Sequence, residues 1–306
     1  MLKTKKRPAV HHSKKSRNAK VFYCVMLAFP VLQFLICYLG VNFNSILLSL
    51  KSYNDGDYQY VGLMNFRMVI DELQMPYMKN MITNSLVVYA VNLFVGLSFC
   101  VVFSYYIYKK SLGHEFFKFI LFLPSIISAV VMAILFKYFT ERGVPALLEG
   151  IFGITGNGLL GNNETRFPTL LFYMIFTGFG SNILLFSGAM SGINESLVDA
   201  AKIDGVNSVQ EFFHITIPMI YPTLTTLIVV STAGIFINQF GLFNFFGNSA
   251  DIADYTVGYY FYKSSKTATL AEYPRLAAMG VLFTLVSAPV TLLLKRILEK
   301  CGPSDE

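Results

Sequence analysis

The sequence has few charged residues and no tryptophan. Asp, Glu, Lys and Arg make up 14% of its 306 residues, whereas hydrophobic residues make up 54%. Typical soluble domains carry roughly 25% charged residues, so this composition excludes an ordinary soluble globular protein. Tyrosine and phenylalanine are plentiful, at 18 and 29 residues, and must therefore supply any aromatic anchors at a membrane interface.

The sequence also lacks the motifs of common catalytic sites. It contains no HExxH, no Cys-x-x-Cys, no phosphate-loop lysine and no nucleophile elbow. We therefore predict that this chain is not an enzyme and carries no catalytic residue, metal site or cofactor of its own. Cys24, Cys37, Cys100 and Cys301 fall in predicted helices or in the C-terminal tail, so a disulfide framework is not indicated.

Long uncharged runs occupy most of the chain. A helix needs about 20 apolar residues to cross a bilayer, and most of these runs are long enough. The predicted fold is an all-α polytopic membrane protein with six transmembrane helices, at residues 21–46, 82–108, 117–138, 169–190, 219–244 and 276–297. Pro124 should bend the third helix, because proline removes one backbone hydrogen bond. We expect external loops at 51–80, 139–166 and 251–275, the second of them a flexible glycine-containing linker.

Basic residues are unevenly distributed along this topology. Fifteen of the 24 Lys and Arg fall on one side of the predicted membrane, eight of them in residues 1–20. The positive-inside rule places that side, with both termini, in the cytoplasm of a cell-membrane protein. We therefore predict a basic cytoplasmic tail at 1–20, a transmembrane domain at 21–300 and a second cytoplasmic tail at 301–306. The basic tail suits contact with anionic lipid better than contact with nucleic acid.

No Asp, Glu, Lys or Arg lies near the centre of a predicted helix. A carrier that runs alone on an ion gradient usually needs an ionisable residue or a discontinuous helix at mid-membrane. An ion-coupled secondary transporter without an ATPase partner is thus the second of two functional interpretations. The first is a membrane bundle that receives its energy from another protein.

The 193–222 segment is a polar passage between the fourth and fifth predicted helices. Asn194 is a plausible N-cap, Gly205 should end a first short helix, and Ser208 with Glu211 fits the capping box of a second. Apolar residues at helical spacing predict one buried face, made of Ile193, Leu197, Ala200 and Ala201. From spacing alone the segment is either an interfacial loop packed on its own bundle or a projection that contacts a partner.

A resemblance favours the projection. Asp199-Ala200-Ala201, Asp204-Gly205, Phe213, Ile215, Pro218 and Pro222 resemble the EAA loop of ABC importer permeases. The run Ala-Ala-Lys-Ile-Asp-Gly is similar to the carbohydrate-uptake branch of that family, the maltose and multiple-sugar type, and Gly62-Leu63-Met64-Asn65-Phe66 resembles a further family segment. Asp199 stands where the family usually has glutamate.

The resemblance implies a permease subunit that imports an oligosaccharide or related polyol by alternating access. It also implies a second homologous permease subunit, two ATPase subunits that bind ATP and Mg, and an extracytoplasmic solute-binding protein. The 193–222 segment would insert into a cleft on an ATPase subunit. The residues that would carry this coupling are Glu195, Asp199, Ala200, Ala201, Asp204, Gly205 and Pro218.

Polar side chains within two predicted helices are candidates for the substrate pathway. Ser181 and Asn182 lie in the fourth helix, and Asn238 and Gln239 lie toward the outer half of the fifth, before an aromatic run. Amide hydrogen bonds and aromatic faces are the usual contacts of sugars. For each residue the alternative is a hydrogen bond that only holds two helices together.

Overall fold

The computed structural model describes residues 14–54, 56–153 and 155–303. Most of the predicted basic tail and the end of the predicted C-terminal tail therefore lie outside the described residues. The described part is mostly helical, with one two-stranded antiparallel hairpin in which Lys51 pairs with Tyr60. The all-α prediction is confirmed.

In chain order, the elements are α1 Lys14–Gln33, π-helix η1 Phe34–Gly40, α2 Val41–Ser49, β1 Lys51–Asn54, β2 Asp57–Tyr60, α3 Met64–Leu73, α4 Pro76–Val91, π-helix η2 Asn92–Gly96, α5 Leu97–Tyr108, α6 His114–Ile126, α7 Ala129–Tyr138, π-helix η3 Phe139–Gly143, α8 Val144–Phe152, α9 Asn163–Ser191, α10 Glu195–Ile203, α11 Ser208–Glu211, π-helix η4 Phe212–Thr216, α12 Ile217–Ala233, α13 Leu242–Phe246, 3-10 helix η5 Ile252–Asp254, α14 Val257–Thr267 and α15 Tyr273–Cys301.

Five continuous helical stretches in the described residues are long and apolar enough to cross a membrane. They are Val21–Ser49, Pro76–Tyr108, Asn163–Ser191, Ser208–Ala233 and Tyr273–Cys301. A sixth span is counted only if the bent pair formed by α6 and the α7–α8 stretch is taken as one. The predicted number of six, and the cytoplasmic placement of the termini, remain predictions.

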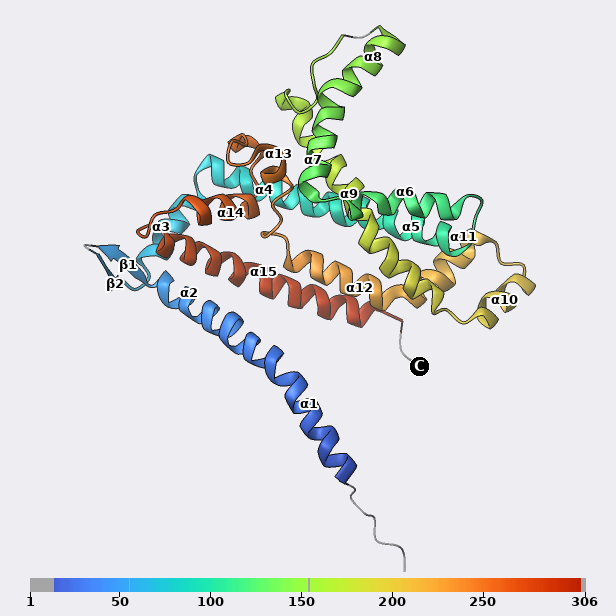
Figure 1. Ribbon diagram of the computed structural model, residues 1–306, viewed down its shortest axis with the longest axis horizontal. Coiled ribbons are helices and arrows are strands. Elements are labelled where there is room, and N and C mark those ends of the chain that lie inside the picture. The colour runs from blue at the N-terminus through green and yellow to red at the C-terminus, as the bar shows by residue number, and fades with distance from the viewer. Residues whose placement is uncertain (1–13, 55, 154, 304–306) are drawn as a thin grey trace, which may run out of the picture.

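The third predicted helix is not a single helix. The helix is interrupted at Ile127 and Ser128, whose extended backbones separate α6 from α7. The chain bends by 107° between α6 and the α7–α8 stretch (Figure 1). The break falls after Pro124, and the predicted bend of this helix is present. Proline weakens the turn before it, and α6 ends at Ile126, two residues after Pro124.

The fifth predicted helix, 219–244, is also corrected. Helix α12 ends at Ala233, and residues 234–241 are irregular before α13 begins. Gly234 follows the last helical residue, and both Phe240 and Gly241 have positive φ. An apolar composition alone does not distinguish this irregular segment from a helix.

The predicted external loops contain regular structure. Residues 51–80 hold the β1–β2 hairpin and α3, and residues 251–275 hold η5 and α14. The prediction of a flexible linker at 139–166 is wrong at both ends of this range, because η3 and α8 continue the helix to Phe152 and α9 begins at Asn163. Near the end of the 139–166 range, the backbone N–H groups of Leu160 and Gly161 donate hydrogen bonds to the Glu141 carboxylate at 2.7 and 3.1 Å.

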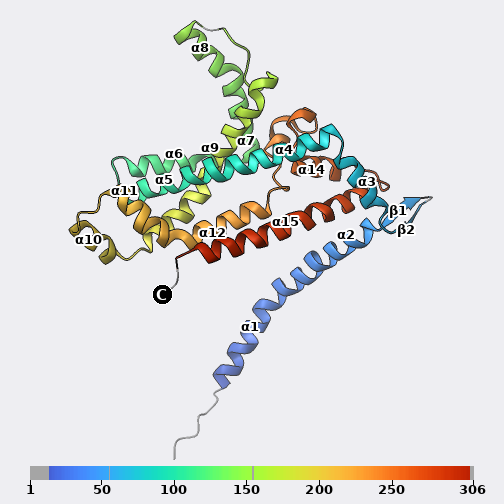
Figure 2. The same ribbon diagram turned by 180° about the vertical axis from the view of Figure 1, so that it is seen from behind.

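The spanning helices lie side by side, with different elements at the two ends of the bundle. The hairpin and α3 lie at one end, whereas α10, α11 and the end of α15 lie at the other (Figures 1 and 2). One apolar core lies toward the hairpin end and includes Met78, Leu170 and Tyr259. A second lies toward the α10 end and includes Phe186, Met190 and Ile220.

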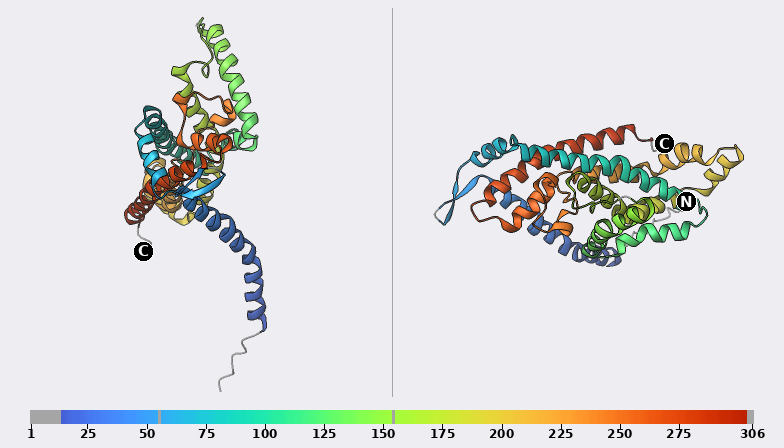
Figure 3. Two further views of the ribbon diagram at one scale, coloured as in Figure 1. Left: turned by 90° about the vertical axis from the view of Figure 1, so that its left-hand side faces the viewer. Right: turned by 90° about the horizontal axis from the view of Figure 1, so that it is seen from above.

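Two helical arms leave this bundle. Helix α8 projects on one side, and the α1–α2 arm diverges on another (Figures 1 and 3). Every side chain from Val21 to Asn44 is exposed in the isolated chain, and most are apolar. An arm of this composition needs lipid or another protein around it.

Gly258, at the start of α14, is in close contact with the irregular segment after α12. A Cβ at this position would overlap the backbone carbonyls of Ile237 and Asn238. Overpacking of this kind costs roughly 1–3 kcal/mol, so Gly258→Ala should lower the melting temperature of the purified protein in detergent. Gly188→Ala in α9 is the matched control, because no heavy atom lies within 4 Å of its added Cβ. Equal melting temperatures for the two variants would contradict this packing.

Candidate functional site

The first half of the 193–222 segment forms as the sequence predicts. Asn194 caps α10 by accepting a hydrogen bond from the Ser196 backbone N–H at 3.0 Å. Glu195 occupies the first turn, where a negative charge is stabilised by the helix dipole. The helix ends in a left-handed turn at Gly205, with φ +79°, and the Val206 N–H bonds back to the Ala201 carbonyl at 3.0 Å.

The cap of the second short helix is shifted by one residue from the prediction. Asn207, not Ser208, accepts hydrogen bonds from the Val209 and Gln210 backbone N–H groups, at 3.0 and 2.9 Å. The reciprocal partner is Gln210, whose side chain accepts from the Asn207 N–H at 3.0 Å. Both pairs fit the same sequence rule, so the rule alone could not choose between them.

The predicted apolar face of α10 is only half correct. Ile193 and Ala201 are buried, but Leu197 and Ala200 are exposed, and the other buried residue is Val198. The turn at Gly192 and Ile193 sets the rotation of α10 against α9, and this rotation cannot be read from the helical period. Exposure of Ala200 leaves a small side chain on the outer surface of α10.

The candidate coupling residues are mostly on the free surface of this segment. Glu195, Asp199, Ala200, Asp204 and Gly205 are exposed, whereas Ala201 is buried and Pro218, at the start of α12, is half-buried. Three of the exposed residues are acidic and form one acidic surface on α10 and its C-cap. Helix α10 lies at one end of the bundle (Figure 1).

Asp199 has an exposed partner within its own helix. Its carboxylate accepts a hydrogen bond from Lys202 at 2.9 Å, and this bond raises the pKa of the lysine. Both side chains are more than half exposed. Such surface pairs contribute little to stability, so Asp199 can exchange this partner for one on another protein.

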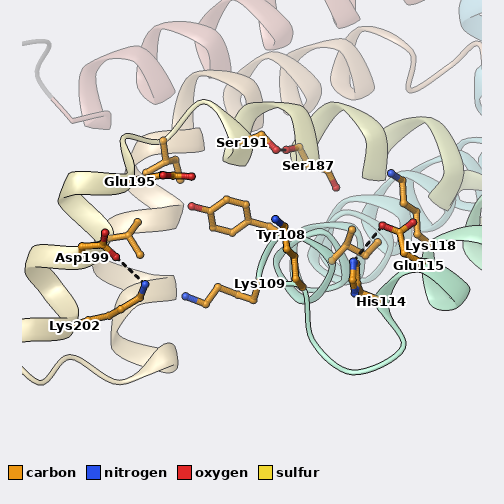
Figure 4. Close-up of a pocket in the computed structure, with 14 residues that line it drawn as sticks. Tyr108, Lys109, His114, Glu115, Lys118, Ser187, Ser191, Glu195, Asp199 and Lys202 are labelled. Carbon is orange, nitrogen blue, oxygen red and sulfur yellow. Dashed lines mark hydrogen bonds and ion pairs between the residues drawn. The ribbon is translucent and has the colours of Figure 1, made fainter.

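A polar cavity of about 600 Å³ separates α10 from the turn between α5 and α6. Asp199 and Lys202 lie on one side of it and Lys109 on the other, with Tyr108 pointing between them (Figure 4). Lys109 also reaches α11: its ammonium group donates to both carboxylate oxygens of Glu211, at 2.9 and 2.8 Å. The sequence analysis did not identify this pair, because the two residues are far apart in the chain.

A further cavity of about 420 Å³ lies beside the break between α6 and α7. Its polar lining comes from three parts of the chain and comprises Ser125, Tyr173, Thr177, Asn238 and Asn244. The Asn238 side chain accepts a hydrogen bond from the Phe240 N–H at 2.8 Å, which holds the irregular segment in place.

The structure does not bring the four predicted substrate-pathway residues together. Asn238 lines the cavity beside the α6–α7 break, whereas Gln239 lines a neighbouring cavity of about 430 Å³ between α12, α14 and α15. Ser181 and Asn182 line neither cavity. Asn244 was missed because it follows the irregular segment within an aromatic run that resembled the end of a membrane helix.

Residues 96–300 match the family described as the inner membrane component of binding-protein-dependent transport systems. The chain belongs to this family. The resemblance identified in the 193–222 segment is therefore confirmed at the level of the family, and with it the prediction of a multi-pass membrane permease.

Relatives align with the permease over most of its length. The arabinooligosaccharides transport system permease protein AraP of Halalkalibacterium halodurans is 26% identical over 292 residues, which cover 90% of this chain and 89% of the relative. The sn-glycerol-3-phosphate transport system permease protein UgpA of Salmonella typhimurium is 29% identical over 185 residues, 60% of this chain and 61% of its own.

Solved structures show the same fold. A chain of a bacterial ABC transporter involved in the import of the acidic polysaccharide alginate superposes with a TM-score of 0.78 at 20% identity, covering 95% of this permease and 99% of that chain. A bacterial alginate transporter in complex with an alginate pentasaccharide-bound periplasmic protein superposes with a TM-score of 0.75, also at 20% identity, covering 92% and 94%.

The two candidate caps of α11 can be told apart by substitution. Asn207→Ala removes a side chain that satisfies two backbone N–H groups, a loss of about 1 kcal/mol. We expect amides of α11 to exchange with deuterium about fivefold faster in this variant. Ser208→Ala should leave exchange unchanged, and the reverse ranking would show that Ser208 is the cap.

Proposed function

We propose that this permease is the translocation subunit of an ATP-driven importer of a carbohydrate or related polyol. The carrying observation is the exposed acidic surface of α10, held at one end of a membrane bundle and connected to α9 by a short turn and to α12 through α11 and η4. Support for the substrate class comes from relatives named for arabinooligosaccharides and sn-glycerol 3-phosphate. The likeness to chains of an alginate importer supports the same class at the level of fold.

The importer has the composition implied by its family resemblance. Two ATPase subunits bind ATP and Mg, a second homologous permease subunit completes the membrane domain, and an extracytoplasmic solute-binding protein delivers the carbohydrate. The exposed arm from Val21 to Asn44 offers an apolar surface for the second permease subunit and for lipid. Both termini and α10 lie in the cytoplasm, as the distribution of basic residues indicates.

Energy enters through the 193–222 segment. Asp199 faces a basic residue in a cleft of the ATPase subunit, Glu195 and Asp204 add negative charge around it, and exposed Ala200 allows close backbone approach. The buried Ala201, the turn at Gly205 and Pro218 shape the segment. Closure of the ATPase pair moves α10, and the attached helices tilt as rigid bodies to switch the cavity from outward-facing to inward-facing.

The cavity beside the α6–α7 break is the substrate site that we propose within this chain. It combines amide groups of Asn238 and Asn244 with the aromatic residues Tyr173 and Phe240, a mixture that suits both the hydroxyls and the C–H surface of a sugar. None of its lining residues is an Asp, Glu, Lys or Arg. Ser181, Asn182 and Gln239 remain candidates for other parts of the pathway.

An ion-coupled secondary transporter is the alternative function. The broken helix at Ile127 and Ser128 is the observation in its favour, because discontinuous helices form the ion sites of many such carriers. Uptake that continues after ATP depletion but stops when the ion gradient is collapsed would establish the alternative. Copurification of an ATPase subunit and ATP-dependent uptake are the outcomes expected from an importer.

Asp199→Lys should abolish ATP-dependent uptake by the reconstituted importer while leaving the assembled complex in the membrane, because it reverses a charge on an exposed surface. Gly205→Val should do the same, because a β-branched residue does not tolerate the left-handed turn. Uptake is measured with a panel of labelled arabinotriose, maltotriose and sn-glycerol 3-phosphate. Asp199→Glu, which restores the usual family residue, is the control and should retain uptake; normal uptake by Asp199→Lys would refute the coupling role.

Asn244→Ala should weaken carbohydrate transport through loss of a hydrogen bond in the proposed substrate site. A lost hydrogen bond of about 1 kcal/mol corresponds to roughly a fivefold rise in the KM for uptake. Thr83→Ala on α4 is the control, since Thr83 is exposed, lines neither cavity, and donates to the backbone carbonyl of Lys79 in its own helix. An unchanged KM for Asn244→Ala would place the substrate elsewhere.

A further inference from the structure

The end of α5 is tied to α11 by an ion pair that is largely shielded from water. Lys109 follows the last residue of α5, and Glu211 is the last residue of α11. The Glu211 residue is only 3% exposed, yet its carboxylate accepts two hydrogen bonds from the one lysine. A buried charge without its partner is strongly unfavourable, so these two groups stay together or both must find new partners.

Further contacts connect the same two elements. The Tyr105 hydroxyl of α5 donates to the carbonyl of Ser208, the first residue of α11, at 2.9 Å. The Tyr105 ring also packs on Phe212, with ring centroids 4.9 Å apart. Both ends of α11 are therefore held against α5.

The covalent route through the 193–222 segment is less rigid than this contact. Between α10 and α11 the chain passes through Gly205, which is exposed and left-handed, and through Val206 and Asn207, which are not helical. A force applied to α10 can be lost as rotation at this point before it reaches α12. The contact with α5 restrains α11, and hence the start of α12, against such rotation.

The contact also leads to the proposed substrate cavity. Lys109 opens the short turn into α6, and this turn is constrained by positive φ angles at Lys110 and Gly113. At the far end of α6, Ser125 and Ile127 form part of the cavity wall. Movement of the α5–α6 turn therefore changes the position of residues that enclose the cavity.

We propose that Lys109 and Glu211 are positioning residues that make α5, α6 and the α11–α12 segment move as one unit when the ATPase subunits act on α10. This inference rests on the proposed function. The exposed Asp199–Lys202 pair lies within α10 and is free to exchange partners, whereas the Lys109–Glu211 pair, in which Glu211 is buried, remains intact through the transport cycle.

Charge reversal tests the pair in the complete reconstituted importer. Lys109→Glu and Glu211→Lys each place like charges in a buried site and should lower the amount of carbohydrate transported per ATP hydrolysed by about tenfold or more. The double variant restores opposite charges and should recover the ratio to within about threefold. The probe is whichever of arabinotriose, maltotriose and sn-glycerol 3-phosphate the wild-type importer accumulates.

The outcomes separate this inference from the proposed function. No ATP-dependent uptake of any probe by the wild-type importer overturns the proposed function. Wild-type uptake with unchanged ratios in both single variants, or a double variant no better than the single ones, overturns only the positioning role. Reversal of the exposed pair Lys295–Glu299 on α15 is the matched control and should leave the ratio unchanged.

A second measurement tests the inference if the single charge-reversal variants fail to assemble. Lys109→Cys with Glu211→Cys is made after the exposed Cys24, Cys37 and Cys301 have been replaced by serine. This variant should transport poorly per ATP hydrolysed, and a short membrane-permeant bismaleimide that joins the two thiols should restore the ratio. Transport that is blocked by the cross-link shows that the two residues separate during the cycle and overturns the inference.

Discussion

Backbone groups within a bilayer core must find hydrogen-bond partners inside the protein, and this constraint determines where the permease can depart from helix. The irregular segment after α12 satisfies it through neighbouring side chains. The Thr256 hydroxyl donates to the Asn238 carbonyl at 2.7 Å, and Thr256 is held in place because the N–H of the next residue, Val257 of α14, donates to the Ser85 hydroxyl of α4 at 2.9 Å. Because these partners exist only at the meeting point of α4, α12 and α14, the irregular backbone lies there, next to the cavity beside the α6–α7 break.

Charged side chains shielded from water need partners for the same reason as the backbone groups. Ionic groups with little exposure occur where they are paired, near the ends of the bundle. At the hairpin end, Arg166 of α9 binds Asp254 at 2.8 Å and Asp251 at 3.4 Å. Burial raises the pKa of Asp254 while the arginine opposes this shift, and the Ala253 backbone N–H lowers the pKa of Asp251. At the opposite end of the bundle, Lys109 and Glu211 form another ion pair of this kind. Among the described residues, Asp254 and Glu211 are the two buried charged side chains, one in each of these pairs.

Sequence reasoning predicted elements that depend on local chemistry. The cap at Asn194 and the turn at Gly205 follow from a side-chain acceptor and from a residue without Cβ, and each needs only its immediate neighbours. Sequence reasoning was less successful where two residues, or two orientations of a helix, fitted the local pattern equally well. Asn207 and Ser208 both fit a cap, and the apolar residues of α10 permitted more than one rotation against α9. In these cases the choice is made by packing against α5 and α9, which the sequence pattern does not contain.

The sequence by itself determined the membrane class, the all-α fold, the family and the acidic segment between two spanning helices, because hydrophobic length, charge distribution and a local motif are properties of neighbouring residues. Only the tertiary structure decided that the third helix turns by 107°, that α12 stops at Ala233, and that Asn238 and Gln239 line different cavities. It also decided the partner of Glu211. These features depend on groups distant in the chain that satisfy one another's hydrogen bonds and charges away from water, and no local pattern records which distant groups will meet.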